Sequence, residues 1–303
     1  MINPIAHAAL LMGVALAFLP RAEAEHYTLF LLTGQSNSLG TTNGGEVDPS
    51  PGSDPADGQV EFFWHNRVDA TTSLGDSGGV FTDLQQQQGG VYPGSPTHWG
   101  PEINFARTLY RGGVRNFGVI KASRGGGGNT LWSKGSADDH MYQHVVDTVT
   151  IATSALAAGG HTFEIAGLLY LQGESDSAAE AAAAGTRLDQ LVLNLRADLP
   201  NATNLHTVVG GIASTGAADD TVRAEQAAIA ASRSYIDYFE NLDLQGNRPD
   251  GLHWDKEAKL RIGERYALAF FEAGVVDRHY GRLTFIGDSI TQGGNGDHPS
   301  YRY

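Results

Sequence analysis

Three side chains in this sequence have the types needed for nucleophilic acyl transfer. Ser36 follows an apolar run in LFLLTGQSNSLG (29–40), and Asp250 and His253 share the segment RPDGLHWD (248–255). A serine hydroxyl becomes an effective nucleophile when an imidazole accepts its proton, and a carboxylate holds that imidazole in the required tautomer. The three residues could therefore form a Ser-His-Asp triad, provided that the fold brings them together.

Each of these residues also has an ordinary structural interpretation. With 11 histidines and 34 acidic residues in the chain, a D-x-x-H pair arises easily by chance. Ser36 could simply cap a helix, and Asp255 competes with Asp250 as the acid beside His253. Asp250, His253 and Asp255 could instead bind a metal ion, although no fourth ligand is evident. The triad therefore depends on further groups that suit the same chemistry.

Two other segments could supply hydrogen-bond donors to an oxyanion. KASRGGGGNTLW (121–132) contains four consecutive glycines, whose amides can approach a substrate closely because no Cβ intervenes. LQGESD (171–176) offers Gln172 and Glu174 after another apolar run. Taken singly, the glycines could be a flexible loop and Ser175 a helix cap. Their shared position after apolar runs, like that of the serine, favours a common site.

Two further features are weaker indications of function. GDSGG (75–79) matches the pattern G-x-S-x-G, but no strand-like run precedes it, and we interpret it as a chance match. Trp64, Trp99 and Trp132 could include a platform on which a sugar stacks. Burial in a core is the commoner fate of tryptophan.

The elements that must position these residues can be read from hydrophobic patterns. Apolar runs typical of buried parallel strands occur at 27–32, 117–122, 165–171, 206–212 and 234–240. Helical periodicity occurs at 102–112, 138–158, 176–198, 219–232 and 254–273. This alternation predicts an α/β fold, a three-layer α/β/α sandwich with a central, mostly parallel five-stranded sheet. Its strands would present the serine and both donor segments at one edge.

Composition excludes several partners. The formal charge of -14 and the pI of about 5.1 argue against nucleic acid and anionic lipid, which a negative surface repels. The chain has no cysteine, which rules out disulfides, thiolate metal sites and thiol nucleophiles. Any nucleophile is therefore oxygen or nitrogen, and we expect no cofactor and no metal.

The first 24 residues resemble a secretory signal peptide. The apolar stretch AALLMGVALAFL is followed by Pro20 and the small-residue sequence AEA (22–24), which predicts cleavage before Glu25. A membrane anchor is the alternative, but the stretch is short for a transmembrane helix of about 20 residues. We expect a secreted or periplasmic protein with no membrane contact after signal removal.

Taken together, the segments resemble the sialate O-acetylesterase-like and carbohydrate esterase family 6 branch of the SGNH hydrolases. The similar segments, in the family's order, are GQSN (34–37), GPEINFA (100–106), KASRGG (121–126), QGESD (172–176) and DGLH (250–253). The resemblance covers about residues 27–273 and implies the SGNH, flavodoxin-like form of the sandwich. The family usually has GGT where this chain has GGGGNT.

The resemblance implies Ser36 as nucleophile, His253 as base and Asp250 as its orienting acid. The activity it implies is a serine esterase that deacetylates O-acetylated carbohydrates, acetylxylan or a similar glycan, through an acetyl-enzyme. A sialate O-acetylesterase and a non-catalytic carbohydrate-binding module are the alternatives.

The resemblance also assigns roles to residues around this triad. The implied oxyanion donors are the amides of Ser36, Gly126 and Gly127 and the side chain of Gln172. Residues that would support the site through hydrogen bonds are Gln35, Asn37 and Glu174.

The predicted organisation has three parts. They are a signal peptide (1–24), an SGNH-type esterase domain (25–276) and the truncated start of a second SGNH domain (277–303). Within the esterase domain, 41–98 is rich in Gly, Pro, Asp and Gln, with only VEFFWHN (60–66) strand-like, and we interpret it as an insertion over the site. FIGDSITQGG (285–294) resembles a second nucleophile block with Ser289 in the serine position, but 14 residues follow it, too few for the remaining blocks.

Overall fold

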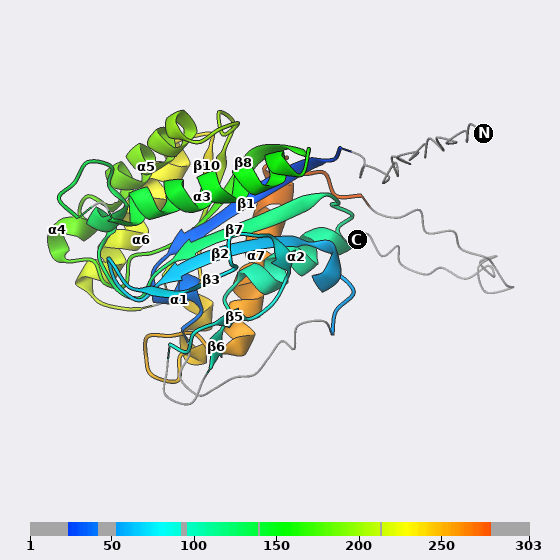
Figure 1. Ribbon diagram of the computed structural model, residues 1–303. Helices are drawn as coiled ribbons and strands as arrows, with labels where there is room; N and C mark the ends of the chain where they lie inside the picture. The colour runs from blue at the N-terminus through cyan, green and yellow to red at the C-terminus, as the bar shows by residue number, and fades with distance from the viewer. Residues whose placement is uncertain (1–23, 42–52, 92–95, 139, 213, 280–303) are drawn as a thin grey trace, which may run out of the picture.

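The computed structural model describes residues 24–41, 53–91, 96–138, 140–212 and 214–279 (Figure 1). The predicted signal peptide and the predicted start of a second domain lie almost wholly outside these ranges, so both stay predictions. No helix within the described ranges has the length and apolar character needed to cross a membrane.

A mostly parallel sheet of eight strands forms the centre of the molecule, in the order β10-β9-β8-β1-β7-β2-β3, with β4 paired to β2. The strands are β1 (His26–Gly34), β2 (Glu61–Arg67), β3 (Ser73–Asp76), β4 (Thr82–Asp83), β7 (Phe117–Ser123), β8 (Thr162–Leu171), β9 (His206–Gly210) and β10 (Ile236–Phe239). Pairing is parallel from β10 to β2, whereas β3 and β4 are antiparallel to β2. The predicted fold class is confirmed, and the five predicted strands are β1, β7, β8, β9 and β10.

The sheet is larger than predicted because part of 41–98 belongs to it. β2 lies parallel to β7, and its residues Phe62, Phe63 and Trp64 are all buried. Burial of consecutive side chains on both faces is typical of an interior strand. Two further short strands, β5 (Gln87–Gln88) and β6 (Thr97–His98), form a separate antiparallel pair. The segment is therefore built into the fold and is not merely an insertion over the site.

Helices cover both faces of the sheet (Figure 1). The α-helices are α1 (Ser36–Leu39), α2 (Glu102–Arg111), α3 (His140–Ala158), α4 (Ala178–Ala181), α5 (Ala184–Asp198), α6 (Ala217–Ser232) and α7 (Lys256–Glu272). The short 3-10 helices are η1 (Asp57–Gln59), η2 (Asn129–Trp132) and η3 (Leu242–Asn247). The helix predicted at 176–198 is two helices, α4 and α5.

The alternation of side chains along β1 explains the two layers. Leu29 and Leu31 pack into one core with residues of α3 and α5, whereas Phe30 and Leu32 pack into the other with residues of α2 and α7. Successive side chains of a strand point to opposite faces, so one apolar run fills both cores. β1 is thereby fixed at the centre of the sheet, with its carboxyl end leading into α1.

Glycines at both ends of α1 allow this turn to pack tightly. Gly34 has a φ of +147°, and a Cβ there would lie 1.9 Å from the carbonyl oxygen of Leu171 at the end of β8. Gly40 has a φ of +99°, and a Cβ there would lie 1.9 Å from the carbonyl oxygen of Trp99. Any larger residue would displace the backbone that carries Ser36.

Candidate active site

The structure brings Ser36, His253 and Asp250 into one hydrogen-bonded line. The His253 Nε2 atom lies 3.0 Å from Ser36 Oγ, and His253 Nδ1 lies 2.7 Å from Asp250 Oδ2. Ser36 is the first residue of α1, and the other two lie in the loop that precedes α7. The geometry suits transfer of the serine proton to Nε2 while the carboxylate fixes the proton on Nδ1.

The turn of the histidine loop is held by Asp250 itself. Its Oδ1 atom accepts hydrogen bonds from the backbone amides of Leu252, at 2.9 Å, and His253, at 2.7 Å. Burial raises the pKa of Asp250, but these bonds and the one from the imidazole outweigh it and lower that pKa to about 2. The carboxylate is therefore ionised at neutral pH and carries a full charge beside the imidazole.

Asp255, the competing acid, has a different role. Its Oδ1 atom accepts from the amide of Ala258 at 3.0 Å, and its Oδ2 atom accepts from Asn247 Nδ2 at 2.9 Å. Asp255 is the N-cap of α7. Across the described ranges, no group of three or more His, Cys, Asp or Glu residues is placed to hold a metal ion.

A cavity of about 420 Å³ opens beside the serine. Ser36 and His253 line it together with Gly126 and Ser175. The apolar side chains that line it are Leu39, Val68, Leu74, Val91 and Leu252. Trp64, Trp99 and Trp132 are at most 4% exposed, so the sequence expectation of a stacking platform among them is wrong.

Of the predicted oxyanion donors, Ser36 and Gly126 border the cavity. The amide of Ser36 lies at the start of α1, where helical N–H groups lack an acceptor within the helix. Gly126 has a φ of +62° that favours glycine, which explains part of the glycine run.

Gln172 and Gly127, the other two predicted donors, are not among the residues that line the cavity. The Gln172 side chain is fully buried, and its Nε2 atom donates to Asp176 Oδ1 at 2.6 Å and lies 3.5 Å from the carbonyl oxygen of Gly127. Asp176 also accepts from the Asn129 amide at 2.9 Å. A carboxylate is a stronger acceptor than a neutral group, so it draws the Gln172 amide away from the cavity. Gln172 thus contacts the glycine loop through the Gly127 carbonyl, away from the cavity.

Asn37 connects the serine turn both to the histidine loop and to Glu174 in the loop after β8. Asn37 Nδ2 donates to Glu174 Oε1 at 2.6 Å and to the Leu252 carbonyl at 3.3 Å, and Asn37 Oδ1 accepts from the Trp254 amide at 3.2 Å. Asn37 thus hydrogen-bonds to the backbone of the residues on both sides of His253. Burial raises the pKa of Glu174 to about 7, and the hydrogen bond from Asn37 opposes this rise.

Gln35 connects the same turn to the loop after β8. Its Oε1 atom accepts from the amides of Gly173, at 3.2 Å, and Ser175, at 3.3 Å, while its Nε2 atom donates to Ser175 Oγ at 3.2 Å. Of the three predicted supporting residues, Gln35 and Asn37 flank Ser36 in the chain, and Glu174 contacts Asn37. Ser175 is not the cap of α4, because Ser177 caps that helix in a capping box with Glu180.

Sequence reasoning missed a buried ion pair beneath the site. Lys121 of β7 and Glu102, the first residue of α2, are both fully buried and lie 2.8 Å apart. A lysine inside the apolar run FGVIKA was the available signal, because a charged residue is almost never fully buried without a partner. Glu102 lies in GPEINFA (100–106), one of the segments that resemble the family.

The sequence matches, over residues 26–272, the family described as carbohydrate esterase, sialic acid-specific acetylesterase. The chain belongs to this family. The resemblance seen in the segments around Ser36 and His253 is confirmed, and the protein is a carboxylic ester hydrolase of the carbohydrate acetylesterase type. No curated protein matches the sequence.

Solved structures with the same fold include several carbohydrate esterases. A protein from Arabidopsis thaliana is 23% identical with a TM-score of 0.61, over 81% of this chain and 98% of that one. A carbohydrate acetylesterase from Xanthomonas citri is 15% identical with a TM-score of 0.56, over 81% of this chain and 56% of that one. NanS is 16% identical with a TM-score of 0.54, over 82% of this chain and 98% of that one. At these identities the comparison with solved structures supports the fold alone.

Proposed function

We propose that this carbohydrate esterase removes acetyl groups from sugar hydroxyls with Ser36 as nucleophile, His253 as base and Asp250 as orienting acid. The observation that carries the proposal is the pair of contacts at His253, 3.0 Å to Ser36 Oγ and 2.7 Å to Asp250 Oδ2. The cavity beside Ser36 provides room for an acetylated substrate.

In the acylation step, His253 Nε2 takes the proton from Ser36 Oγ as this oxygen attacks the acetyl carbonyl carbon. The carbonyl oxygen becomes an oxyanion, to which the amides of Ser36 and Gly126 donate. The bond to the sugar oxygen then breaks, and the imidazolium returns its proton to that oxygen. The sugar alcohol leaves, and the acetyl group stays on Ser36.

In the deacylation step, water attacks the acetyl-enzyme. His253 takes a proton from the water, and the second oxyanion uses the same two amides. Collapse of this intermediate breaks the bond to Ser36 Oγ, which recovers its proton from the imidazolium. Acetate leaves, and the chain's own residues suffice for every proton transfer.

Two substrate classes are candidates. Acetylxylan or a similar neutral glycan agrees with the apolar side chains around the cavity and with the acidic character of the whole chain. O-acetylated sialic acid is the second candidate, because the family description names sialic acid. Acetate release measured side by side from acetylxylan and from O-acetylated sialic acid separates the two.

Replacement of the nucleophile tests the proposal. We expect Ser36→Ala to fold and to lose at least about 10³-fold in kcat on p-nitrophenyl acetate. The matched control is Ser77→Ala, because Ser77 belongs to the GDSGG match near the end of the edge strand β3. Parent-like turnover by a folded Ser36→Ala protein, or loss of turnover in Ser77→Ala, contradicts the assignment.

A non-catalytic carbohydrate-binding role is the alternative from another class. It requires that the parent protein bind a glycan without releasing acetate from any acetylated sugar.

Export stays a separate prediction from residues 1–24, and sequencing the N-terminus of the secreted chain tests whether it begins at Glu25.

A further inference from the structure

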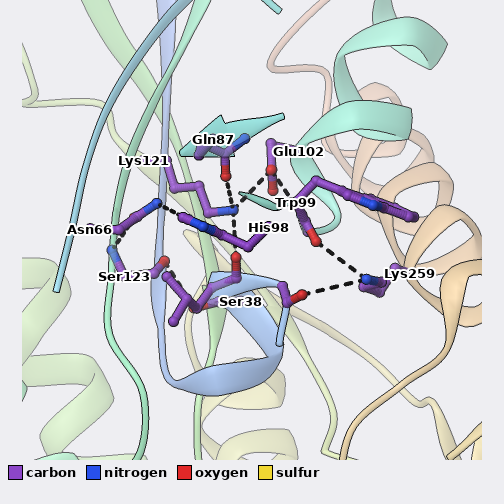
Figure 2. Close-up of polar contacts among 12 residues, drawn as sticks. Ser38, Asn66, Gln87, His98, Trp99, Glu102, Lys121, Ser123 and Lys259 are labelled. Atoms are coloured by element: carbon purple, nitrogen blue, oxygen red, sulfur yellow. Dashed lines mark hydrogen bonds and ion pairs between the residues drawn. The ribbon is translucent and has the colours of Figure 1, made fainter. Parts of the chain in front are cut away.

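A buried polar network packs against α1, the helix that carries Ser36, on the side away from solvent (Figure 2). Its centre is Lys121, whose ammonium donates to the Leu39 carbonyl at 2.9 Å, to Gln87 Oε1 at 2.8 Å and to Glu102 Oε1 at 2.8 Å. An ammonium has three N–H donors, so these three acceptors use all of them. Leu39 is the last residue of α1, which places the cation at the carbonyl end of that helix.

The protonated form of Lys121 is the one that this environment requires. Burial lowers the pKa of Lys121, and the charge and hydrogen bond of Glu102 oppose that effect. A neutral amine has only two N–H groups and would leave one of the three buried acceptors without a donor. Glu102 Oε1 also accepts from the Gly100 amide at 2.8 Å, so the carboxylate is itself held in place.

A second lysine, from α7, lies near the same end of α1. Lys259 of α7 is 1% exposed, and its Nζ atom lies 3.4 Å from the carbonyl oxygens of Gly40 and Trp99 and 3.9 Å from the centroid of the Trp99 ring. Cations near the last carbonyls of a helix are favourable because they satisfy carbonyls that the helix leaves open.

A chain of hydrogen bonds fixes the side of α1 as well. Ser38 Oγ lies 2.8 Å from the Gln35 carbonyl and 2.9 Å from Ser123 Oγ, and the Ser123 amide donates to Asn66 Oδ1 at 3.1 Å. Asn66 Nδ2 lies 2.8 Å from His98 Nε2. Burial, the largest effect, and the nearby Lys121 lower the pKa of His98 to about 3, so the imidazole stays neutral and accepts from Asn66.

The length of α1 links these contacts to Ser36. The helix has four residues, and the Gly40 and Thr41 amides both donate to the Ser36 carbonyl at 2.9 Å. In a single turn, a displacement of the last residue shifts the first. Buried ion pairs often add little stability compared with apolar residues of the same size, so their value lies in the geometry that they impose.

We propose that Lys121, held by Glu102, is a positioning residue for the nucleophile: it fixes the Leu39 carbonyl and thereby keeps Ser36 Oγ within hydrogen-bond distance of His253. This inference rests on the proposed function of Ser36. Neither lysine touches substrate in this role. They act through the backbone of α1.

The experiment compares two buried ion pairs that are both anchored on α2. Arg107 donates to Asp57 through Nε and Nη2, both at 2.7 Å, and the two side chains are at most 8% exposed. Arg107→Met is therefore a matched control for Lys121→Met, because it removes a buried cation of α2 whose carboxylate partner, Asp57, lies in η1 and not in α1. Both variants are assayed well below their melting temperatures.

Two readouts separate positioning from stability. We expect Lys121→Met to lower kcat on p-nitrophenyl acetate roughly 10- to 100-fold with KM within about twofold of the parent. The rate at which a fluorophosphonate labels Ser36 should fall by a similar factor. Arg107→Met should lose thermal stability but keep kcat and the labelling rate within about twofold.

Conservative replacement of Glu102 provides a second test that does not depend on folding of Lys121→Met. Glu102→Gln keeps an oxygen acceptor for Lys121 and should retain most of kcat, whereas Glu102→Ala removes it and should lose kcat at unchanged KM. Equal kcat in the two Glu102 variants, or a parent labelling rate in Lys121→Met, overturns the inference alone. A parent protein that neither reacts with the fluorophosphonate nor releases acetate overturns the proposed function itself.

Discussion

The turn that carries Ser36 is held from two sides by polar contacts of different character. On the cavity side, His253 and Asp250 have side chains that are 13% and 21% exposed. On the covered side, the Lys121 and Glu102 side chains are fully buried. The first set joins α1 to loops, and the second joins it to β7 of the sheet and to the neighbouring helix α2.

The difference in exposure determines what each side can tolerate. Water can replace a lost partner at the edge of the cavity. Removal of one group there should therefore disturb the positions of the reacting groups more than it lowers the free energy of unfolding. Water does not reach the covered side, where a group left without its partner bears the full desolvation cost. Variants on the cavity side should therefore separate activity from stability, and variants on the covered side that leave a buried group without its partner should change both.

The largest loss of turnover on the cavity side is expected for Asp250→Asn. The amide would present a donor to His253 Nδ1, which favours the tautomer with its proton on Nε2 and leaves no acceptor for Ser36. We expect kcat on p-nitrophenyl acetate to fall about 10³- to 10⁴-fold. The melting temperature should change little, because asparagine can still accept from the Leu252 and His253 amides through its oxygen.

The control for Asp250→Asn is the same substitution at Asp255, the other acid of the loop. Asp255→Asn keeps an oxygen that can cap α7 and should retain the parent kcat. If Asp255→Asn were the variant that lost activity, Asp255 and not Asp250 would orient the imidazole.

A smaller effect is expected for Asn37→Ala. This change removes the contacts to Glu174, to the Leu252 carbonyl and to the Trp254 amide, so the histidine loop is no longer hydrogen-bonded to the Asn37 side chain of α1. We expect kcat to fall roughly 10- to 100-fold, since small misplacements of reacting groups have effects of that order. KM should stay close to that of the parent.

The control for Asn37 uses an asparagine that bonds to the backbone of α7 itself and not to the histidine loop. Asn104 Nδ2 donates to the Leu260 carbonyl at 2.8 Å, within the helix itself. Asn104→Ala should cost some stability and leave kcat unchanged. Equal losses of kcat in both variants would mean that general loosening of α7, and not the loop around His253, controls activity.

The parts of the fold that the sequence predicts are those with a local signature. β1, β7 and β8 are apolar runs, and the serine and the glycine loop follow them directly, so their meeting at one edge follows from parallel pairing. β3 to β6 contain two to four residues each, many of them polar, and no pattern of that length predicts a strand. β3 and β4 pair with β2, whose partner β7 is distant in the chain, whereas β5 and β6 pair with each other.

The same distinction applies to the site. D-x-x-H lies within one turn, so Asp250 and His253 could be matched from spacing alone. The orientation of Gln172 is decided by Asp176, and the burial of Lys121 is decided by Glu102 and Gln87. Such contacts form between side chains whose positions are set only after the loops have folded, so spacing could not predict them.

The smallest effect on turnover, and a distinct effect on stability, is expected for Glu174→Gln. Glu174 Oε2 is buried and, within the described residues, has no hydrogen-bond partner, and burial raises its pKa from 4.5 to about 7. The folded state thus holds a proton that the unfolded state releases at lower pH. Relative to Glu174→Gln, the parent should lose up to about 3 kcal/mol of unfolding free energy as pH rises from about 4.5 to about 7, with no further change above.

Chemical denaturation of both proteins at several pH values measures this difference. Glutamine can still accept from Asn37, so kcat should stay within about threefold of the parent at pH 8. Glu257→Gln, a change on the exposed surface of α7, should leave the pH dependence of the parent unaltered. A parent curve that runs parallel to that of Glu174→Gln between pH 4.5 and 7 would show that water reaches Glu174, and the cavity side would then extend deeper beneath α1 than its contacts indicate.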